Sequence, residues 1–413
     1  KFNQKQSLSY LSSAFVKGLK SWNNNELQWN IHLAVLGAPN FVQRNIDSIG
    51  VIPFFHQPIY HSNKSAILLL PELSYKRKIG KYFILKAGNE RLHVSPGYRS
   101  MIFSNQAGAL PQLGLITTIG KFKFYNAWAR TKHFNSHSGE KQAKYVALHG
   151  LKWQFNSKWS AEFTEMVTWQ TRDSASRREL DLHYLNPFLF YRPVEYAQGS
   201  ADNVLMSAQV IFQPTKYFKT YGQFLLDEFL LREVRNRIGW WGNKFGGLIG
   251  LQAISKKTKG LIYQSEWSFA RPYTYTHGSE AQAWGHWNTP FAHPLGANFY
   301  EWWQRVQYAK DKWSYDIVGA WSAFGRDPNY NVGGNIFHSY KAPWQQYNNF
   351  ILQGVRSTLL ILDAQISYSL TPEWQLSGLF RWRSLRSRDN PFDEQWIMVG
   401  IKNPNALAMP DPF

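Results

Sequence analysis

Two long segments of this chain place polar and charged side chains among aromatic residues. Residues 181–203 contain two prolines, acidic residues and amides beside Tyr and Phe, and residues 271–300 contain repeated Tyr, His and Asn. Aromatic rings stack against the CH face of a sugar, and Arg, His and Asn form directional hydrogen bonds to its hydroxyl groups. These residue types therefore indicate glycan recognition. The alternative is that the aromatic residues only pack a folded segment and the rim of a membrane protein.

Eight residues are candidates for a ligand-binding surface. They are Arg99, Arg192, Glu195, Asp202, Asn203, Arg271, His277 and His293. The guanidinium groups of Arg99, Arg192 and Arg271 have the planar fork that binds a carboxylate or phosphate in bidentate fashion. We expect the three arginines to contact the acidic groups of an anionic polymer.

The sequence lacks the residues that several other kinds of site require. The chain has no cysteine, which excludes disulfides, thiolate zinc sites and cysteine nucleophiles. The Gly-rich stretch 242–247 lacks the spacing of a phosphate-binding loop and is expected to mark the start of a strand. Asp227 and Glu228 are adjacent, so in a regular strand they point to opposite faces. We expect no catalytic centre, metal or cofactor, and an enzyme is the minority alternative.

The composition is typical of a chain that partly faces lipid. Aromatic residues make up 17% of the chain and charged residues only 18%, against roughly 25% charged residues in soluble domains. The longest apolar run, residues 66–70, is far shorter than the ~20 residues of a spanning helix. A β-barrel shows lipid only every second residue, so its mean hydropathy stays polar. The mean hydropathy of this chain is -0.41.

The formal net charge of +19 is spread along the chain. A clustered excess of Lys and Arg would indicate nucleic-acid binding, which we do not expect here. An anionic glycan or the phosphates of lipopolysaccharide would complement the same positive charge. The remaining interpretation is that the basic residues only solvate a lumen and loops.

Apolar residues repeat with a period of two along much of the chain. Between residues 360 and 370 they occupy the even positions, opposite Asp363 and Gln365, and after a Thr371-Pro372-Glu373 turn the alternation resumes. The same pattern occurs in residues 27–35, 204–213, 218–227, 261–269, 300–308 and 313–317. Strands of this length cross a bilayer when tilted. Their length, the charges at mid-strand and the aromatic residues at both ends favour a transmembrane barrel over a soluble β-sandwich.

The connections alternate between short and long. Short turns are expected at Gly120, 156–158, Pro214-Thr215, 310–312 and Thr371-Pro372, and long loops at roughly 36–63, 90–110, 171–200, 271–298 and 325–356. This alternation is the outer-membrane pattern. We predict an all-β fold: a closed, antiparallel up-and-down transmembrane β-barrel of 16 to 18 strands, with 18 preferred. Residues 1–413 form one domain, and loops plug the lumen. The chain begins at Lys1 without Met, so we expect a mature or trimmed protein.

A series of short motifs runs through the middle of the chain: Gly88-Asn89, Gly97-Tyr98-Arg99-Ser100, Tyr184-Leu185-Asn186-Pro187, Tyr191-Arg192-Pro193-Val194-Glu195, Asp202-Asn203-Val204-Leu205, Tyr221-Gly222-Gln223-Phe224-Leu225-Leu226-Asp227, Arg271-Pro272-Tyr273-Thr274-Tyr275 and His293-Pro294-Leu295-Gly296-Ala297-Asn298. Together they resemble the Wzi-type capsule-assembly family and its RemB-type gliding-motility relatives. They cover residues 80 to 310 in the family order. Ser95-Pro96-Gly97 stands where family members often have Gly-Asp-Gly, which weakens a ligand role for that loop. The region before residue 80 is shorter than the corresponding region of family members.

The resemblance implies an 18-stranded barrel of the bacterial outer membrane that anchors or organises surface material. In the capsule branch it would hold polysaccharide, and in the gliding branch it would contact other envelope or secretion proteins. Its surroundings would be the lipid bilayer and lipopolysaccharide. Replacing Arg192 and Arg271 by Ala is then expected to lower retention of surface glycan. The alternatives are a diffusion channel for small solutes and a structural subunit of an envelope machine.

Overall fold

The computed structural model describes residues 10–37, 59–62, 65–105, 108–135, 138–171, 181–186, 191 and 202–403. Its strands are β1 (Tyr10–Trp22), β2 (Asn25–Gly37), β3 (Tyr60–His61), β4 (Ser65–Ile79), β5 (Phe83–Arg91), β6 (Ala109–Ile119), β7 (Phe122–Phe134), β8 (Lys141–Gln154), β9 (Trp159–Gln170), β10 (Asn203–Thr215), β11 (Phe218–Glu228), β12 (Lys244–Ile254), β13 (Leu261–Ala270), β14 (Gly285–His286), β15 (Thr289–Pro290), β16 (Phe299–Lys310), β17 (Trp313–Arg326), β18 (Val355–Ser369), β19 (Gln375–Ser387) and β20 (Phe392–Lys402). The helical segments are η2 (Leu182–Leu185), α3 (Leu231–Asn236) and η3 (Glu280–Gln282). No helix in these ranges is long and apolar enough to cross a membrane.

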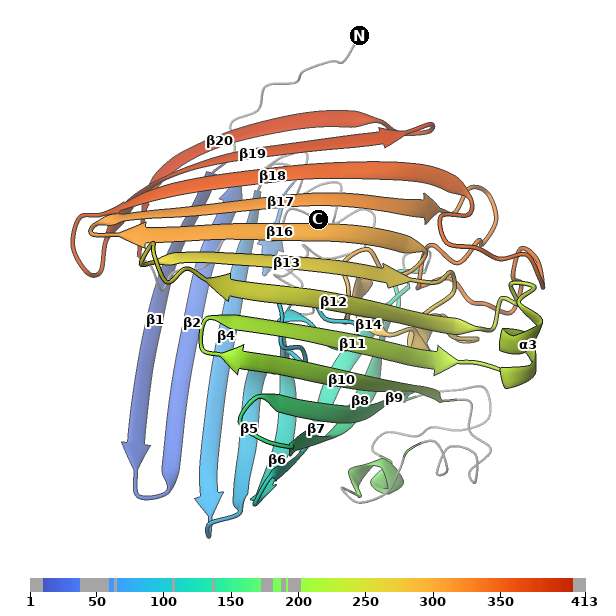
Figure 1. Ribbon diagram of the computed structural model, residues 1–413, viewed down its shortest axis with the longest axis horizontal. Coiled ribbons are helices and arrows are strands. Elements are labelled where there is room, and N and C mark those ends of the chain that lie inside the picture. The colour runs from blue at the N-terminus through green and yellow to red at the C-terminus, as the bar shows by residue number, and fades with distance from the viewer. Residues whose placement is uncertain are drawn as a thin grey trace.

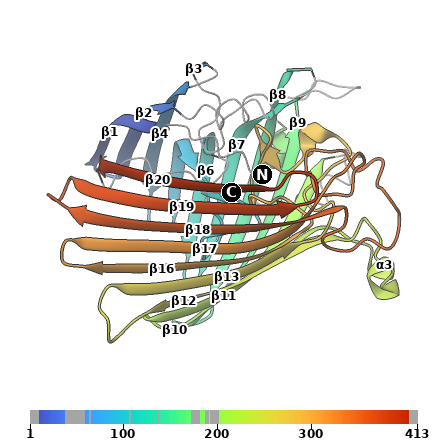
Figure 2. The ribbon, with the colours of Figure 1, turned by 90° about the horizontal axis from the view of Figure 1, so that it is seen from above.

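The described strands form one 18-stranded antiparallel sheet in up-and-down order, with β14 and β15 as a separate hairpin. Each long strand pairs with its neighbour along the chain, for example β17 with β18 and β18 with β19. The sheet curves around a central space, as Figures 1 and 2 show from two directions. The predicted all-β, up-and-down barrel architecture is confirmed, and the sheet has the predicted 18 strands when the two-residue β3 is counted.

The barrel has a seam at its first and last strands. Among the described residues no hydrogen-bonded ladder joins β1 to β20, so the prediction of a fully closed sheet is wrong for this part of the chain. The two-residue β3 does not span the wall, which leaves seventeen long strands. Because neighbours alternate in direction, the first and last of an odd number run parallel. The antiparallel pairing found elsewhere therefore cannot join them.

The period-two pattern separates an apolar outer face from a polar inner face. In β18 the outward residues Leu362 and Ile366 are exposed, as is Leu370 directly after the strand. On the inner face, Asp363 accepts a hydrogen bond of 2.6 Å from Nη2 of Arg381 in β19. The pairing of these charges inside the barrel, and the apolar residues outside it, match the alternation predicted from the sequence.

Exposed aromatic side chains gather where the strands meet the short turns. They include Trp22, Phe122, Trp153, Trp159, Trp313 and Trp374. Trp and Tyr are enriched at the boundary between lipid and water because their rings are apolar and their tips polar. These residues therefore mark one edge of the apolar outer face.

Short turns and long loops lie at opposite ends of the barrel. Figure 1 shows the loops after β11 and β17, with α3, at the right and the short turns of β10–β11, β12–β13 and β16–β17 at the left. One predicted turn is displaced, because Pro214 and Thr215 belong to β10 and the turn lies at residues 216–217. The register shifts between Phe212 and Thr215, and such a bulge accepts a proline that lacks an N–H donor.

The main hydrophobic core lies inside the barrel. Residues 92–105, 271–298 and 327–354, which we call the plug, pack against the inner faces of the strands. Phe103 stacks on Phe291 with 4.4 Å between ring centroids, and Trp284 Nε1 donates a 2.6 Å hydrogen bond to the carbonyl of Ile102. The contacts tie two loops far apart in sequence into one body, so the predicted filling of the lumen by loops is confirmed.

Candidate functional site

A buried ion pair attaches the plug to the barrel wall. Arg99 Nε donates a 2.7 Å hydrogen bond to Glu301 Oε1 and its Nη2 a 3.3 Å bond to Oε2. Nε2 of His293 lies 3.0 Å from the same Oε1, and all three side chains are buried. Arg99 thus binds a carboxylate in the predicted bidentate manner, but the carboxylate belongs to β16 of this chain.

A second carboxylate on the barrel wall accepts hydrogen bonds from the loop backbone at Tyr98 and Arg99. Glu266 of β13 accepts hydrogen bonds from the backbone N–H groups of Tyr98, at 2.6 Å, and Arg99, at 2.8 Å. The Tyr221 hydroxyl donates to it at 2.6 Å. A side chain at Gly97 would place Cβ 2.2 Å from Glu266 Oε1. Glycine at this position therefore permits the close approach.

Asp202 and Asn203 hold another part of the plug. Asp202 accepts hydrogen bonds of 2.8 Å from the hydroxyl of Tyr184 and 3.0 Å from Nε2 of Gln282. Asn203 Nδ2 donates a 3.0 Å bond to the Gln282 carbonyl. Both residues are buried. These contacts connect the start of β10 to the plug segment at η3.

Arg271 and His277 lie in other parts of the same plug segment. Arg271 Nη2 donates weak 3.4 Å hydrogen bonds to the carbonyls of Trp240 and Asn349. Burial, followed by the charges of Lys244 and Lys341, lowers the pKa of His277 to about 3. The imidazole is therefore neutral at physiological pH.

The structure brings some of the eight predicted residues together and separates others. Arg99 and His293 meet at Glu301, and Asp202 and Asn203 meet at Gln282, whereas Arg271 and His277 contact different groups. Arg192 and Glu195 lie outside the described residues. The contacts described above are internal to the chain, and a ligand-binding role for the eight residues stays a prediction.

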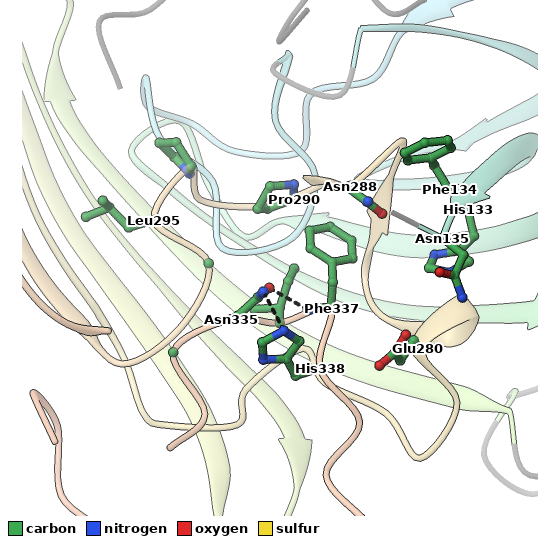
Figure 3. Close-up of a pocket in the computed structure, with 14 residues that line it drawn as sticks. His133, Phe134, Asn135, Glu280, Asn288, Pro290, Leu295, Asn335, Phe337 and His338 are labelled. Atoms are coloured by element: carbon green, nitrogen blue, oxygen red, sulfur yellow. Dashed lines mark hydrogen bonds between the residues drawn. The ribbon is translucent and has the colours of Figure 1, made fainter. Parts of the chain in front are cut away.

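A cavity of about 260 Å³ opens within the mouth of the barrel. Its lining comes from the end of β7, the segment 280–296 that contains the β14–β15 hairpin, and the loop between β17 and β18. Figure 3 shows His133, Phe134 and Asn135 on one side and Leu295 on the other. The hairpin is held against β7 because Lys132 N–H donates to His286 Nδ1 at 2.9 Å and Trp287 N–H donates to the Lys132 carbonyl at 2.9 Å.

The cavity combines apolar surface with polar groups, one of which lacks a hydrogen-bond partner in the part of the chain that the structure describes. Phe337 contributes a partly buried aromatic ring. Oδ1 of Asn288 is buried and has no hydrogen-bond partner among the described residues. Asn335 Nδ2 lies 3.1 Å from His338 Nε2, and His338 Nδ1 lies 2.9 Å from Asp327 Oδ2. The lining therefore combines an amide, a histidine and an aromatic ring, which are the groups that contact small polar ligands.

Sequence analysis singled out the segment 271–300, which supplies part of this lining, but missed the lining residues at 133–135 and 334–338. The stretch 327–338 is rich in Asp, Asn and Gly, which is a signal for a structured turn and a reason to examine the loop. Nothing local, however, places Asn335 opposite Asn135 or beside Asn288. That arrangement depends on how three separate segments pack inside the barrel.

One pair of carboxylates behaves differently from the prediction. Asp227 and Glu228 were expected on opposite faces, yet Lys244 Nζ lies 3.4 Å from Asp227 Oδ1 and 3.2 Å from Glu228 Oε2. The register between β11 and β12 shifts at this point, from Leu226 to Glu228, so the regular alternation is lost. Both acids consequently bind one ammonium group. In the described ranges no group of three or more His, Cys, Asp or Glu side chains is placed to hold a metal ion.

An antiparallel barrel with an apolar outer face and loops filling its interior defines the class of plugged outer-membrane β-barrels. Solved structures of this class resemble the chain. Wzi of Escherichia coli, a carbohydrate-binding β-barrel involved in group 1 capsule assembly, aligns with a TM-score of 0.58 and 11% identity over 97% of this chain and 84% of Wzi.

Two further solved barrels align less closely. OccK8 of Pseudomonas aeruginosa has a TM-score of 0.48 and 10% identity, over 97% of this chain and 94% of its own. OccAB2 of Acinetobacter baumannii has a TM-score of 0.49 and 10% identity, over 95% of this chain and 91% of its own. No protein-family model and no curated protein sequence matches the chain. At these identities the similarity to Wzi establishes the fold.

Proposed function

We propose that this protein is a non-catalytic barrel of the bacterial outer membrane that binds surface polysaccharide at its plugged mouth. The observation that carries the proposal is the cavity lined by Asn288 and Phe337, in which the amide oxygen of Asn288 is buried without a hydrogen-bond partner among the described residues. A buried acceptor of this kind is costly unless a ligand or water satisfies it. A sugar hydroxyl supplies the missing donor while its CH face packs on Phe337.

The size of the cavity limits the ligand to one sugar ring. Its volume of about 260 Å³ is below the roughly 300–1,000 Å³ of typical small-molecule sites. Glu280, Asn335 and His338 are exposed at its edge, where neighbouring sugar residues can continue into solvent. We therefore propose that one residue of the polymer enters the cavity while the rest of the chain stays outside.

The plug supports anchoring over diffusion. A barrel of 16 to 18 strands leaves an aqueous channel when nothing fills it, but here Phe103, Trp284 and Phe291 are fully buried within the lumen. The Arg99–Glu301 pair joins the plug to the wall. Wzi is a carbohydrate-binding barrel, and the proposal extends that ligand class to the present chain.

Binding of extracted surface polysaccharide by an Asn288→Gly variant tests the proposal. Asn288 has a φ of 54°, which glycine adopts without strain, so the substitution removes the amide and keeps the turn. Loss of one hydrogen bond of about 1 kcal/mol predicts roughly five- to tenfold weaker binding in titration calorimetry. Asn348→Gly is the matched control, because Asn348 has a φ of 61° and does not line the cavity. Equal affinity of the wild type and Asn288→Gly would refute the site.

Two measurements on the purified barrel separate the remaining alternatives. In planar bilayers we expect almost no conductance, whereas stable current steps would replace the proposal by a diffusion channel. After extraction in mild detergent we expect polysaccharide to co-purify. Stoichiometric envelope or secretion proteins in its place would support a role through protein contact.

A further inference from the structure

The outer wall of the barrel has an apolar groove of about 480 Å³ over strands β9 to β13. One row of directly opposed residues across four of these strands reads Val210, Gly222, Ile249 and Trp267. Opposed residues in an antiparallel ladder share a face, and three members of this row are exposed large side chains. Gly222 has none, so the wall is hollow at this point.

The groove continues toward the short turns. The next row of opposed residues contains Thr220 and Ser265, whose side chains are small. At its edge Trp159 stacks on Phe212 with 4.3 Å between ring centroids. Because Trp159 belongs to the aromatic edge of the apolar face, the groove lies on the side of this edge that faces hydrocarbon.

Lysines follow directly beyond the groove. The three short turns below it contain Lys158, Lys216, Lys256, Lys257 and Lys259 and no acidic residue. All five are exposed, and none forms an ion pair within the described part of the chain. Lys216 and Lys256 both lie over the ring of Tyr217, with Nζ 5.2 and 5.1 Å from its centroid. Two ammonium groups that lack an acidic partner among the described residues therefore lie around one tyrosine ring, and an anion at this turn would neutralise their charge.

We propose that the groove and these lysines form one binding site for an anionic phospholipid of the leaflet that faces the short turns. The phosphate binds Lys216 and Lys256, and an acyl chain lies over Gly222. Lys216 and Thr220 are four residues apart, roughly 13 Å along the strand, a distance that the glycerol and upper acyl chain span. The inference rests on the membrane placement proposed above and is independent of polysaccharide binding.

Native mass spectrometry of the full chain in detergent tests the site, with palmitoyl-oleoyl phosphatidylglycerol and phosphatidylcholine as probes at equal concentration. We expect the wild type to retain the anionic lipid roughly fivefold more, as suits two lysines at a membrane surface. The Lys216→Gln/Lys256→Gln variant should lose this preference. Gly222→Leu should reduce retention of both lipids severalfold, since a Cβ there meets its nearest atoms at 3.8 Å and the added side chain fills the groove without a clash.

Matched controls change the same residue types elsewhere on the outer wall. Gly319→Leu adds a side chain where no atom lies within 4 Å of the new Cβ, on β17. Lys310→Gln/Lys312→Gln removes two lysines from the β16–β17 turn. Both controls should retain the wild-type preference. Circular dichroism of every variant verifies that the barrel is folded.

Each contrary outcome overturns the inference. An unchanged lipid ratio in the double-lysine variant excludes the phosphate contact, and undiminished retention in Gly222→Leu excludes the groove. Displacement of lipid by inorganic phosphate alone would show that the lysines bind a free anion. Failure of the wild type to insert into phosphatidylcholine vesicles would instead contradict the membrane placement, which separates that failure from an inserted barrel without lipid preference.

Discussion

At the scale of single residues, Asp327 organises the loop that forms one side of the cavity proposed to bind a sugar. Its Oδ1 accepts hydrogen bonds from the backbone N–H groups of Gly334, at 2.9 Å, and Val332, at 3.2 Å. Its Oδ2 lies 2.9 Å from Nδ1 of His338. The carboxylate therefore fixes both the turn and the orientation of the imidazole that lines the cavity.

This arrangement predicts a pH-dependent cavity. The hydrogen bond to Asp327 is the main cause that raises the pKa of His338, and the charges of Asp327 and Glu280 add to it against the effect of burial. Because the pKa of His338 is raised on folding, the contact stabilises the loop fully at a pH below the unfolded-state pKa of about 6.5. This stabilisation is lost as the pH rises through the folded-state pKa. We expect an NMR titration midpoint for His338 above that of a free histidine, and weaker glycan binding at alkaline pH.

Asp327→Asn supplies the control for this titration. The variant keeps a hydrogen-bonding side chain but removes the negative charge, so the pKa of His338 should fall toward its ordinary value. A wild-type midpoint at or below that ordinary value would contradict the assignment of Asp327 as the partner that stabilises the charged imidazole.

At the scale of elements, the plug is assembled from loops whose conformations depend on the wall. The two-residue turn between β14 and β15 has positive φ at Trp287, 48°, and Asn288, 54°. This is the backbone of a tight hairpin turn that non-glycine residues adopt reluctantly. Contacts with β7 and the anchoring of the loop by His293 at Glu301 hold it in place.

Glu301→Ala is expected to loosen the plug. The substitution leaves the buried guanidinium of Arg99 without its carboxylate, and breaking a buried pair in this way costs about 3–5 kcal/mol. Trypsin cleavage after Arg99, which requires the loop to leave the lumen, should accelerate roughly 100-fold or more. Glu301→Gln keeps hydrogen-bonding atoms and should show a smaller effect. Equal cleavage rates in the wild type and Glu301→Ala would mean that this pair does not hold the plug.

At the scale of the whole molecule, the barrel separates three environments. The outer face carries apolar side chains such as Leu362 and Trp321, the lumen carries paired charges such as Asp363 and Arg381, and the turns carry exposed lysines. Lipid contact explains the first arrangement, and ion pairing in a confined space explains the second.

A charge on the outer face should destabilise the barrel more than one in the lumen. Leu362 is exposed at the middle of β18, so Leu362→Arg is expected to lower the free energy of unfolding in vesicles by about 2–4 kcal/mol. Gln365→Arg is the inward control, because Gln365 is the register partner of Asp316 in β17. Urea titration of both variants measures the difference, and similar losses would argue against lipid contact at Leu362.

The sequence by itself determined the strands and their faces. Alternation is a local property, since successive side chains in a strand point to opposite sides whatever the partner strand is. Residues 360–370 therefore revealed which face is apolar, and loop lengths revealed the two ends of the barrel. The alternation failed as a guide only at irregularities such as the bulge beside Asp227, where an extra residue turns two adjacent acids toward Lys244.

Only the tertiary structure decided what the polar residues of the loops contact. Arg99 and Glu301 are separated by 202 positions and meet because curvature of the sheet brings a loop against a distant strand. Asn288 lines a cavity with Asn335 for the same reason. Such contacts have no periodic signature, because they depend on how several loops share one enclosed volume. Residue types therefore indicated which side chains could form a site at the mouth, and packing inside the barrel decided which of them lie together.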